Sequence, residues 1–221
     1  MPFMTSFNGN PNIGLFGYAS NEYCLLGDDV RMKVAKRIAE TLNVQLHRVS
    51  IAGTSLMGVF CAGNSKSMII PSIAFDEEMK KLDKAGIRYE VIETRFTALG
   101  NNVLANDHGC LVNPDMEDEA IKQIENALRV KVKRATIAGL NTLGSLAVLN
   151  RHGCLANYDI SEDETQEIRK VLKLKTLPSS INRGNPYVKS GLILNDLDYV
   201  VGDQSTGVEI GEVENALGFI R

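Results

Sequence analysis

Two copies of a His-Gly-Cys tripeptide are the residues of this chain best suited to chemistry. His108-Gly109-Cys110 recurs 44 residues later as His152-Gly153-Cys154. Imidazole and thiolate groups are the preferred ligands of zinc, and a Cys beside a His can act as a nucleophile. Zinc sites, however, usually draw their Cys from closely spaced pairs, which the sequence lacks. Whether these residues do chemistry therefore depends on the elements that carry them.

The tripeptides belong to a repeat that runs through the whole chain. Gly100 to Leu111 and Gly144 to Leu155 share six identical positions in twelve. Further copies give an aligned series, spaced by 42 to 45 residues, at Ser20, Asn64, Asn106, Asn150 and Asn195. We expect one domain spanning 1–221, with an N-terminal strand at 1–5 and units at approximately 6–49, 50–93, 94–135, 136–179 and 180–221.

The repeat argues against a metal site and against a ring of ligand-binding asparagines. The position held by the cysteine of each tripeptide is occupied across the five units by Cys24, Met68, Cys110, Cys154 and Tyr199. A position that accepts Met and Tyr is a packing position, so no metal and no cofactor are expected. The aligned asparagines are expected to bond the neighbouring backbone in turns or caps, because Asn does so readily.

Each unit has the pattern of a small α/β module. Two short apolar segments joined by a turn are followed by an amphipathic helix and another strand. Ser161 with Glu164, and Thr206 with Glu209, predict capping boxes, and Asp76 and Asp115 predict N-caps. The last helix is expected to end at Leu217, which leaves too few residues for a final strand. The N-terminal strand is therefore expected to complete the fifth unit, giving an α/β, five-bladed α/β propeller with pseudo-fivefold symmetry and outer helices.

Glycines that open the units mark the candidate site. Gly14, Gly58, Gly100 and Gly144 are equivalent, and in the fifth unit either Lys189 takes this position or a shift in the repeat obscures it. In a closed ring these glycines lie at one end of the axis. The residues that follow them then surround a single face, at Leu15, Val59, Asn101 and Ser145. Arg183 lies in a Gly-containing corner, where its guanidinium could contact a carboxylate or phosphate.

Composition narrows the class of partner. The 24 Lys and Arg nearly balance the 27 Asp and Glu, which argues against affinity based mainly on phosphate neutralisation, as in DNA binding. The N-terminus lacks a signal-peptide pattern, and no apolar run approaches the ~18 residues that span a bilayer. The four cysteines form no Cys-x-x-Cys pair and predict free thiols. We expect a cytoplasmic protein with no membrane partner.

Short segments from all five units, in order along the chain, carry a family resemblance. They are Ser6-Phe7 with Asn12-Ile13-Gly14, Ser50-Ile51-Ala52-Gly53 with Leu56-Met57-Gly58, Thr97-Ala98-Leu99-Gly100-Asn101 with Asn106-Asp107, Thr136-Ile137-Ala138 with Leu143-Gly144-Ser145, and Asn182-Arg183-Gly184 with Asn195-Asp196 and Thr206 to Glu209. Together these segments resemble the archaeal and eukaryotic translation initiation factor 6 family, in the archaeal form. A five-unit ring of this kind also resembles the pentein fold.

The resemblance implies a factor that binds the large ribosomal subunit and blocks its association with the small one. It also implies that Gly14, Val59 and Asn101 lie on the ribosome-binding face. Val59 replaces the basic residue of eukaryotic relatives. The balanced charge suggests a ribosomal protein as main contact and rRNA as secondary contact, with a monomeric factor. Replacing Asn101 or Gly14 with a bulky acidic residue is expected to weaken binding without unfolding the ring.

An enzyme is the alternative function. Other pentein rings modify guanidino groups with a nucleophilic Cys late in the chain and a nearby His. Here the last Cys is Cys154, and no His follows His152, so we expect no enzymatic activity. The enzyme hypothesis predicts turnover of a guanidino substrate that is lost when Cys154 or Cys110 becomes Ala. A scaffold with no ribosomal role is a third alternative.

Overall fold

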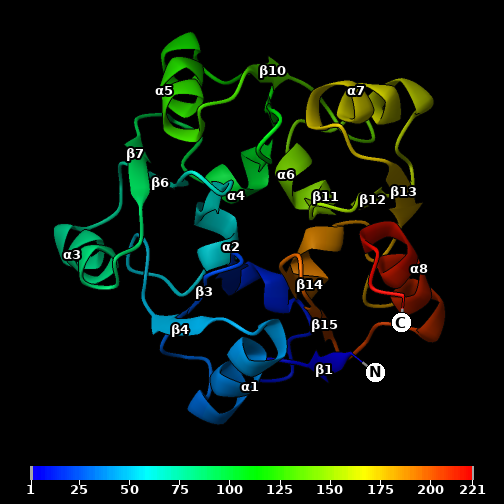
Figure 1. Cartoon of the computed structure of the whole chain (residues 1–221), viewed down its shortest axis with the longest axis horizontal. Coiled ribbons are helices and arrows are strands. Elements are labelled where there is room, and N and C mark those ends of the chain that lie inside the picture. Colours follow the sequence, from blue (N-terminus) through cyan, green and yellow to red (C-terminus); the bar gives the residue numbers. More distant parts are fainter. Residues whose placement is uncertain (1, 221) are drawn as a thin grey trace.

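Five small sheets surround a common axis, and each sheet has three strands (Figure 1). A computed structural model of the chain describes residues 2–220. Met1 and Arg221, the outer limits of the expected first and last segments, lie outside the described residues. Long helices lie on the outside of the ring and short helical turns line its centre.

Each blade repeats the same order of elements. In chain order the blades are η1 (Ile13–Leu15), β2 (Gly17–Ala19), β3 (Tyr23–Leu26), α1 (Met32–Leu42), β4 (Gln45–Arg48); α2 (Met57–Phe60), β5 (Ala62–Gly63), β6 (Met68–Pro71), α3 (Asp76–Lys84), β7 (Tyr89–Ile92); α4 (Leu99–Asn102), β8 (Val103–Ala105), β9 (Cys110–Val112), α5 (Asp118–Leu128), β10 (Val132–Arg134); α6 (Leu143–Leu146), β11 (Ala147–Leu149), β12 (Cys154–Asn157), α7 (Glu162–Leu172), β13 (Thr176–Ser179); and η2 (Val188–Gly191), β14 (Leu192–Leu194), β15 (Tyr199–Gly202), α8 (Gly207–Leu217), with β1 (Phe3–Thr5). Among residues 2–220, no helix is both long and apolar enough to cross a bilayer.

The N-terminal strand closes the ring, as the sequence predicts. In every blade a hairpin of two antiparallel strands is followed by a helix and a parallel third strand, for example β2, β3 and β4. In the fifth blade the third strand is β1, whose Phe3 pairs with Val200 of β15 in parallel register. Chain ends that meet in one sheet remove the open edges that an unclosed array would expose.

The predicted packing position lies in the core of every blade. Its five residues, Cys24, Met68, Cys110, Cys154 and Tyr199, are all buried on the central strands. His108 and His152, by contrast, are exposed at hairpin tips. Within residues 2–220 no group of three or more His, Cys, Asp or Glu could hold a metal ion. Burial confirms the packing interpretation of the cysteines.

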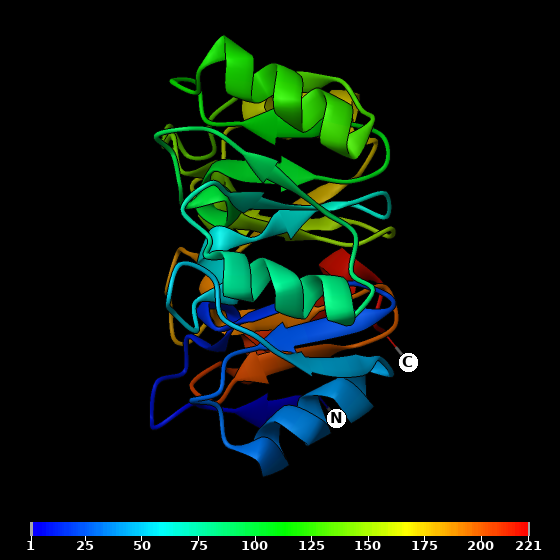
Figure 2. The same ribbon diagram turned by 90° about the vertical axis from the view of Figure 1, so that its left-hand side faces the viewer.

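The two ends of the ring are built differently, as the side view shows (Figure 2). Each hairpin's first strand runs from a central helical turn to a hairpin tip, so turns and tips lie at opposite ends. We call the first end the turn face and the second the hairpin face. The turn face carries Leu15, Val59, Asn101, Ser145 and Arg183; the tips of the hairpin face are Asn21, Ser65, Asp107, Arg151 and Asp196.

The repeated asparagines join neighbouring blades through the backbone. The Asn64 side-chain amide donates to the Leu128 carbonyl at the end of α5 (2.9 Å), while its Oδ1 accepts from the Lys66 amide (3.0 Å). Asn106, Asn150 and Asn195 repeat this pattern on Leu172, Leu217 and Leu42. Each Asn thus caps the carboxyl end of a helix in another blade, which confirms the predicted backbone role.

Ser20 breaks this pattern in the first blade. Its Oγ accepts from the Glu22 and Tyr23 amides, as an Asn would, but the side chain is too short to reach a helix end. The carbonyl it would cap is that of Ala85, which precedes the positive-φ Gly86 after α3. No hydrogen bond to the Ala85 carbonyl is found among the described residues.

Ser20→Asn is therefore expected to stabilise the fold by about 0.5–1.5 kcal/mol, the usual net value of one added hydrogen bond. The reason is that Asn would supply the missing donor to Ala85 while keeping the turn bonds of Ser20. Urea unfolding followed by circular dichroism measures the change. The reverse substitution, Asn106→Ser in the third blade, is the matched control and should destabilise. A neutral or destabilising Ser20→Asn would contradict the capping account.

Helix starts are tied to the turn face by glutamates. The capping boxes predicted at Ser161 and Thr206 are present. The predicted N-caps Asp76 and Asp115 are wrong: Phe75 and Glu117 occupy these positions. Local sequence could not show this, because Glu78 and Glu117 bond distant backbone amides and so fix where each helix begins.

Candidate functional site

A ring of glycines forms the centre of the turn face. A Cβ atom on Gly144 would lie 2.6 Å from the carbonyl oxygens of both Gly100 and Val103 in the preceding blade. On Gly58 or Gly100, a Cβ would overlap the carbonyl oxygen of the preceding blade's glycine. Here glycine is required for close backbone approach between blades rather than for positive φ.

Gly14 has the same role and is buried. A Cβ there would overlap the Lys189 carbonyl oxygen of the fifth blade. Gly14 thus lies where the ring closes and offers no side chain to a partner. The expectation that a bulky residue at Gly14 leaves the ring folded is therefore wrong.

The four residues that follow the glycines lie together around the axis, as the sequence predicts. Leu15, Val59, Asn101 and Ser145 are all half-buried. The Ser145 hydroxyl donates to the Thr142 carbonyl (2.7 Å). The Asn101 carboxamide has no hydrogen-bond partner among the described residues, which leaves both its donor and its acceptor open to a ligand. In the fifth blade the equivalent Ser190 is buried and bonded to Asn12 (3.0 Å), so it is closed to partners.

Arg183 lies at the rim of this face. It is exposed, in the loop between β13 and η2, with φ of 64°. The loop is held by Glu209, which accepts from the Arg183 and Gly184 amides and caps α8 through Thr206. Burial raises the pKa of Glu209, but these hydrogen bonds outweigh it and leave the pKa lowered. A carboxylate that stays ionised therefore fixes the backbone that presents Arg183.

Glu164 plays the same part in the fourth blade. It accepts from the Ala138 and Gly139 amides at 3.0 Å each and completes the cap at Ser161. Burial opposes ionisation, yet the hydrogen bonds lower the pKa of Glu164 to about 2. The Ala52-Gly53 corner of the second blade and the Ala138-Gly139 corner of the fourth are thus each anchored by a glutamate in the first turn of an outer helix.

Lys189 is a further residue near the axis, for which the sequence predicted no role. It replaces the ring glycine in the fifth blade, and its Nζ donates to the Gly100 carbonyl of the third blade (2.5 Å). The side chain therefore crosses the axis on the inner side of the turn face. Burial lowers the pKa of Lys189 to about 8, although the charge interaction with Cys61 acts in the opposite direction. A Lys where four blades have Gly was the signal in the sequence.

Lys189→Met is expected to remove a pH dependence of stability. Since the folded pKa is about 8 against 10.5 ordinarily, the unfolded chain binds more protons between these values. The charged Lys thus costs stability below pH 8, and the cost disappears as pH rises to 10.5. We expect the stability difference between variant and native chain to change by about 1–3 kcal/mol across this range. Urea unfolding at both limits measures it; a constant difference would contradict the shift.

Comparison with known proteins finds relatives whose sequence similarity extends over nearly the whole chain. Residues 3–216 match the eIF-6 family. The translation initiation factor 6 of Aeropyrum pernix is 44% identical, with 96% of this chain and 93% of that protein covered. That of Pyrococcus furiosus is also 44% identical, with 97% of each chain covered.

Solved structures with a similar fold are distant in sequence. The N-terminal domain of ArgZ, an arginine dihydrolase from cyanobacteria, has a TM-score of 0.57 at 11% identity, covering 81% of this chain and 73% of that one. DDAH from Pseudomonas aeruginosa has a TM-score of 0.51 at 10% identity, covering 75% and 67%. These proteins have the pentein fold, and the likeness extends to the fold alone.

Proposed function

We propose that this chain, which belongs to the eIF-6 family and is thus a translation initiation factor, binds the large ribosomal subunit. By binding there, it sterically prevents the association of the large subunit with the small subunit. The observation that carries the proposal is the turn face of a closed ring in a chain with such relatives. Blocking by steric exclusion needs affinity and bulk, and a rigid ring supplies both. The proposed place of action is the cytoplasm.

The turn face suits a protein partner better than a nucleic acid. Leu15 and Val59 are apolar, Asn101 and Ser145 are neutral and polar, and Arg183 is the one charged member of the set. Such a surface gives little of the phosphate neutralisation on which nucleic-acid affinity depends. We therefore propose a ribosomal protein as main contact, with Arg183 at the rim free to reach rRNA, and a monomeric factor. Gly14 contributes by holding the ring closed.

Catalysis forms no part of this proposal, and the thiols support that choice. All four cysteines are buried. Burial raises the pKa of Cys24, Cys61 and Cys154 to about 12, and that of Cys110 further. A thiol that stays protonated and lacks solvent access is a poor nucleophile. A guanidino-modifying reaction through Cys154 or Cys110 therefore has little chemical support here.

Co-sedimentation tests the proposal. The purified chain is centrifuged through a sucrose gradient with free large subunits, with free small subunits, and alone. We expect it to move with the large subunits and to reduce subunit joining measured by light scattering. Failure to move with large subunits would overturn the proposal, while binding without inhibition of joining would overturn steric exclusion.

A further inference from the structure

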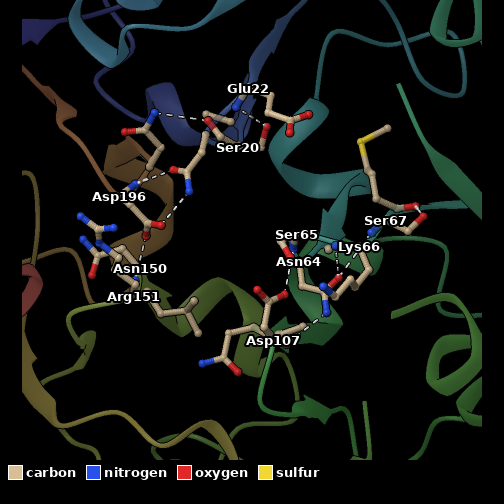
Figure 3. A pocket seen from close by; sticks show the side chains of 18 of the residues that line it. Ser20, Glu22, Asn64, Ser65, Lys66, Ser67, Asp107, Asn150, Arg151 and Asp196 are labelled. Atoms are coloured by element: carbon tan, nitrogen blue, oxygen red, sulfur yellow. Dashed lines mark hydrogen bonds between the residues drawn. The ribbon is translucent and has the colours of Figure 1, made fainter. Parts of the chain in front are cut away.

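The hairpin face contains a cavity of about 640 Å³ on the ring axis. Figure 3 shows the hairpin tips around it. Three of the five junctions between neighbouring tips are bridged: Ser65 to Asp107, Arg151 to Asp196, and Asn21 to Asp196. No tip-to-tip hydrogen bond joins the first and second blades, or the third and fourth, among the described residues.

The junction of the first and second blades is also where the asparagine cap is missing. Ser20 lines the cavity there, together with Gly86 to Arg88, which follow α3. The space that an Asn carboxamide fills in four blades is thus part of the cavity. Ala85 directly precedes Gly86 of this lining, and its carbonyl lies at the carboxyl end of α3, where a helix carries partial negative charge. We call this part of the cavity, at the junction of the first and second blades, the recess. Within residues 2–220, its helix-end carbonyl lacks the side-chain N–H donor that the equivalent carbonyls receive at the other four junctions.

Charged groups without protein partners line the same recess. Lys66 and Arg88 come from the second blade and form no ion pair or hydrogen bond through their side chains among the described residues. Glu22 comes from the tip of the first blade, and Figure 3 shows no bond between Glu22 and Lys66. The cavity's other acids, Asp107 and Asp196, accept bonds from neighbouring tips. The recess thus offers two free cations and one free carboxylate.

Aromatic rings form the inner wall of the cavity. Tyr18 and Tyr23 both line it, with ring centroids 6.4 Å apart. Burial is the main cause that raises the pKa of both phenols, so the two hydroxyl groups stay protonated and can donate hydrogen bonds. Flat apolar surface beside fixed polar groups is typical of pockets for small organic ligands, which span roughly 300–1,000 Å³.

We propose that this recess binds a nucleoside monophosphate whose base carries an amino group. The amino group donates to the Ala85 carbonyl in place of the missing carboxamide, and the base lies against Tyr18 and Tyr23. The phosphate pairs with Arg88 and Lys66, and ribose hydroxyls donate to Glu22. This site lies at the opposite end of the ring from the turn face and does not depend on the proposed ribosomal role.

Titration calorimetry with AMP tests the site on the full chain. Adenosine and inorganic phosphate are the two part-ligands, and a short single strand of adenylate separates a free nucleotide from a nucleotide within RNA. We expect saturable AMP binding, at least about tenfold tighter than either part-ligand. Stronger binding of the strand would identify RNA as the source of the nucleotide. The absence of saturable AMP binding, or phosphate binding as tight as AMP, would overturn the proposal.

Three variants locate the ligand. Ser20→Asn fills the recess with the group found in the other blades, and Arg88→Met removes the phosphate partner; each should weaken AMP binding by about tenfold or more. Lys131→Met is the matched control, because Lys131 is the equivalent of Arg88 in the third blade and lies away from the cavity. Equal AMP affinity in Ser20→Asn and the native chain would overturn the assignment. Loss of AMP binding in Ser20→Asn would not report unfolding, because this substitution adds a helix cap and is expected to stabilise the fold.

Discussion

Gly58→Ala is expected to destabilise the protein by more than about 4 kcal/mol, beyond the range of ordinary point substitutions. The reason is that its new Cβ would overlap the Gly14 carbonyl oxygen, a backbone atom that can retreat only if the first and second blades separate. Because every blade packs on the next around a closed ring, that displacement cannot be confined to one junction. Urea and thermal unfolding followed by circular dichroism measure the loss.

The matched control is Gly211→Ala. Gly211 lies within α8, and a Cβ there would meet nothing within 4 Å. Alanine is favoured over glycine in a helix interior by about 1 kcal/mol, so this variant should be as stable as the native chain or more so. If Gly58→Ala unfolded at the same urea concentration as Gly211→Ala, the close packing of the ring glycines would be refuted.

The same geometry changes how substitutions at Gly14 are interpreted. Because Gly14 is buried against the Lys189 carbonyl, a larger residue there opens the junction between the first and fifth blades. Loss of ribosome binding in such a variant would report loss of ring closure rather than loss of a contact. A test of the turn face therefore needs residues with accessible side chains, of which Asn101 is the best placed.

The repeat made most of the fold predictable from the sequence. Five copies of one pattern fix the length of the repeat. Because the fifth copy ends before its third strand, the repeat predicts that Phe3–Thr5 supplies this strand and pairs with β15. The asparagine role was also predictable, since Asn64 and its equivalents recur where a turn is needed. Repetition averages out the ambiguity that any single short strand or helix would have.

Features that break the repeat were harder to predict. That Ser20 leaves a carbonyl uncapped follows only when the Asn64 amide is seen to reach another blade's helix. The reach of Lys189 to Gly100 depends on two blades that are not neighbours. Helix starts at Phe75 and Glu117 depend on glutamates that bond distant loops. Each of these rests on contacts between units, which a pattern within one unit does not encode.

Asn101→Glu is expected to weaken binding to large ribosomal subunits by about ten- to a hundredfold, the range for a charged replacement at the centre of an interface. The Asn101 carboxamide lies half-buried on the turn face with no partner among the described residues. A carboxylate there loses both amide donors and brings an uncompensated charge into the contact. Co-sedimentation across a range of subunit concentrations measures the affinity.

Gln45→Glu is the charge-matched control, because it also replaces a neutral amide with a carboxylate, at an exposed position on the hairpin-face end of the first blade. Both variants should keep native stability, since neither residue is part of the core. If Asn101→Glu bound as tightly as the native chain while Gln45→Glu bound weakly, the hairpin face would meet the ribosome instead. In that case the subunit would cover the axial cavity, and AMP should compete with large subunits. Competition by AMP is thus a second, independent measure of which end of the ring docks.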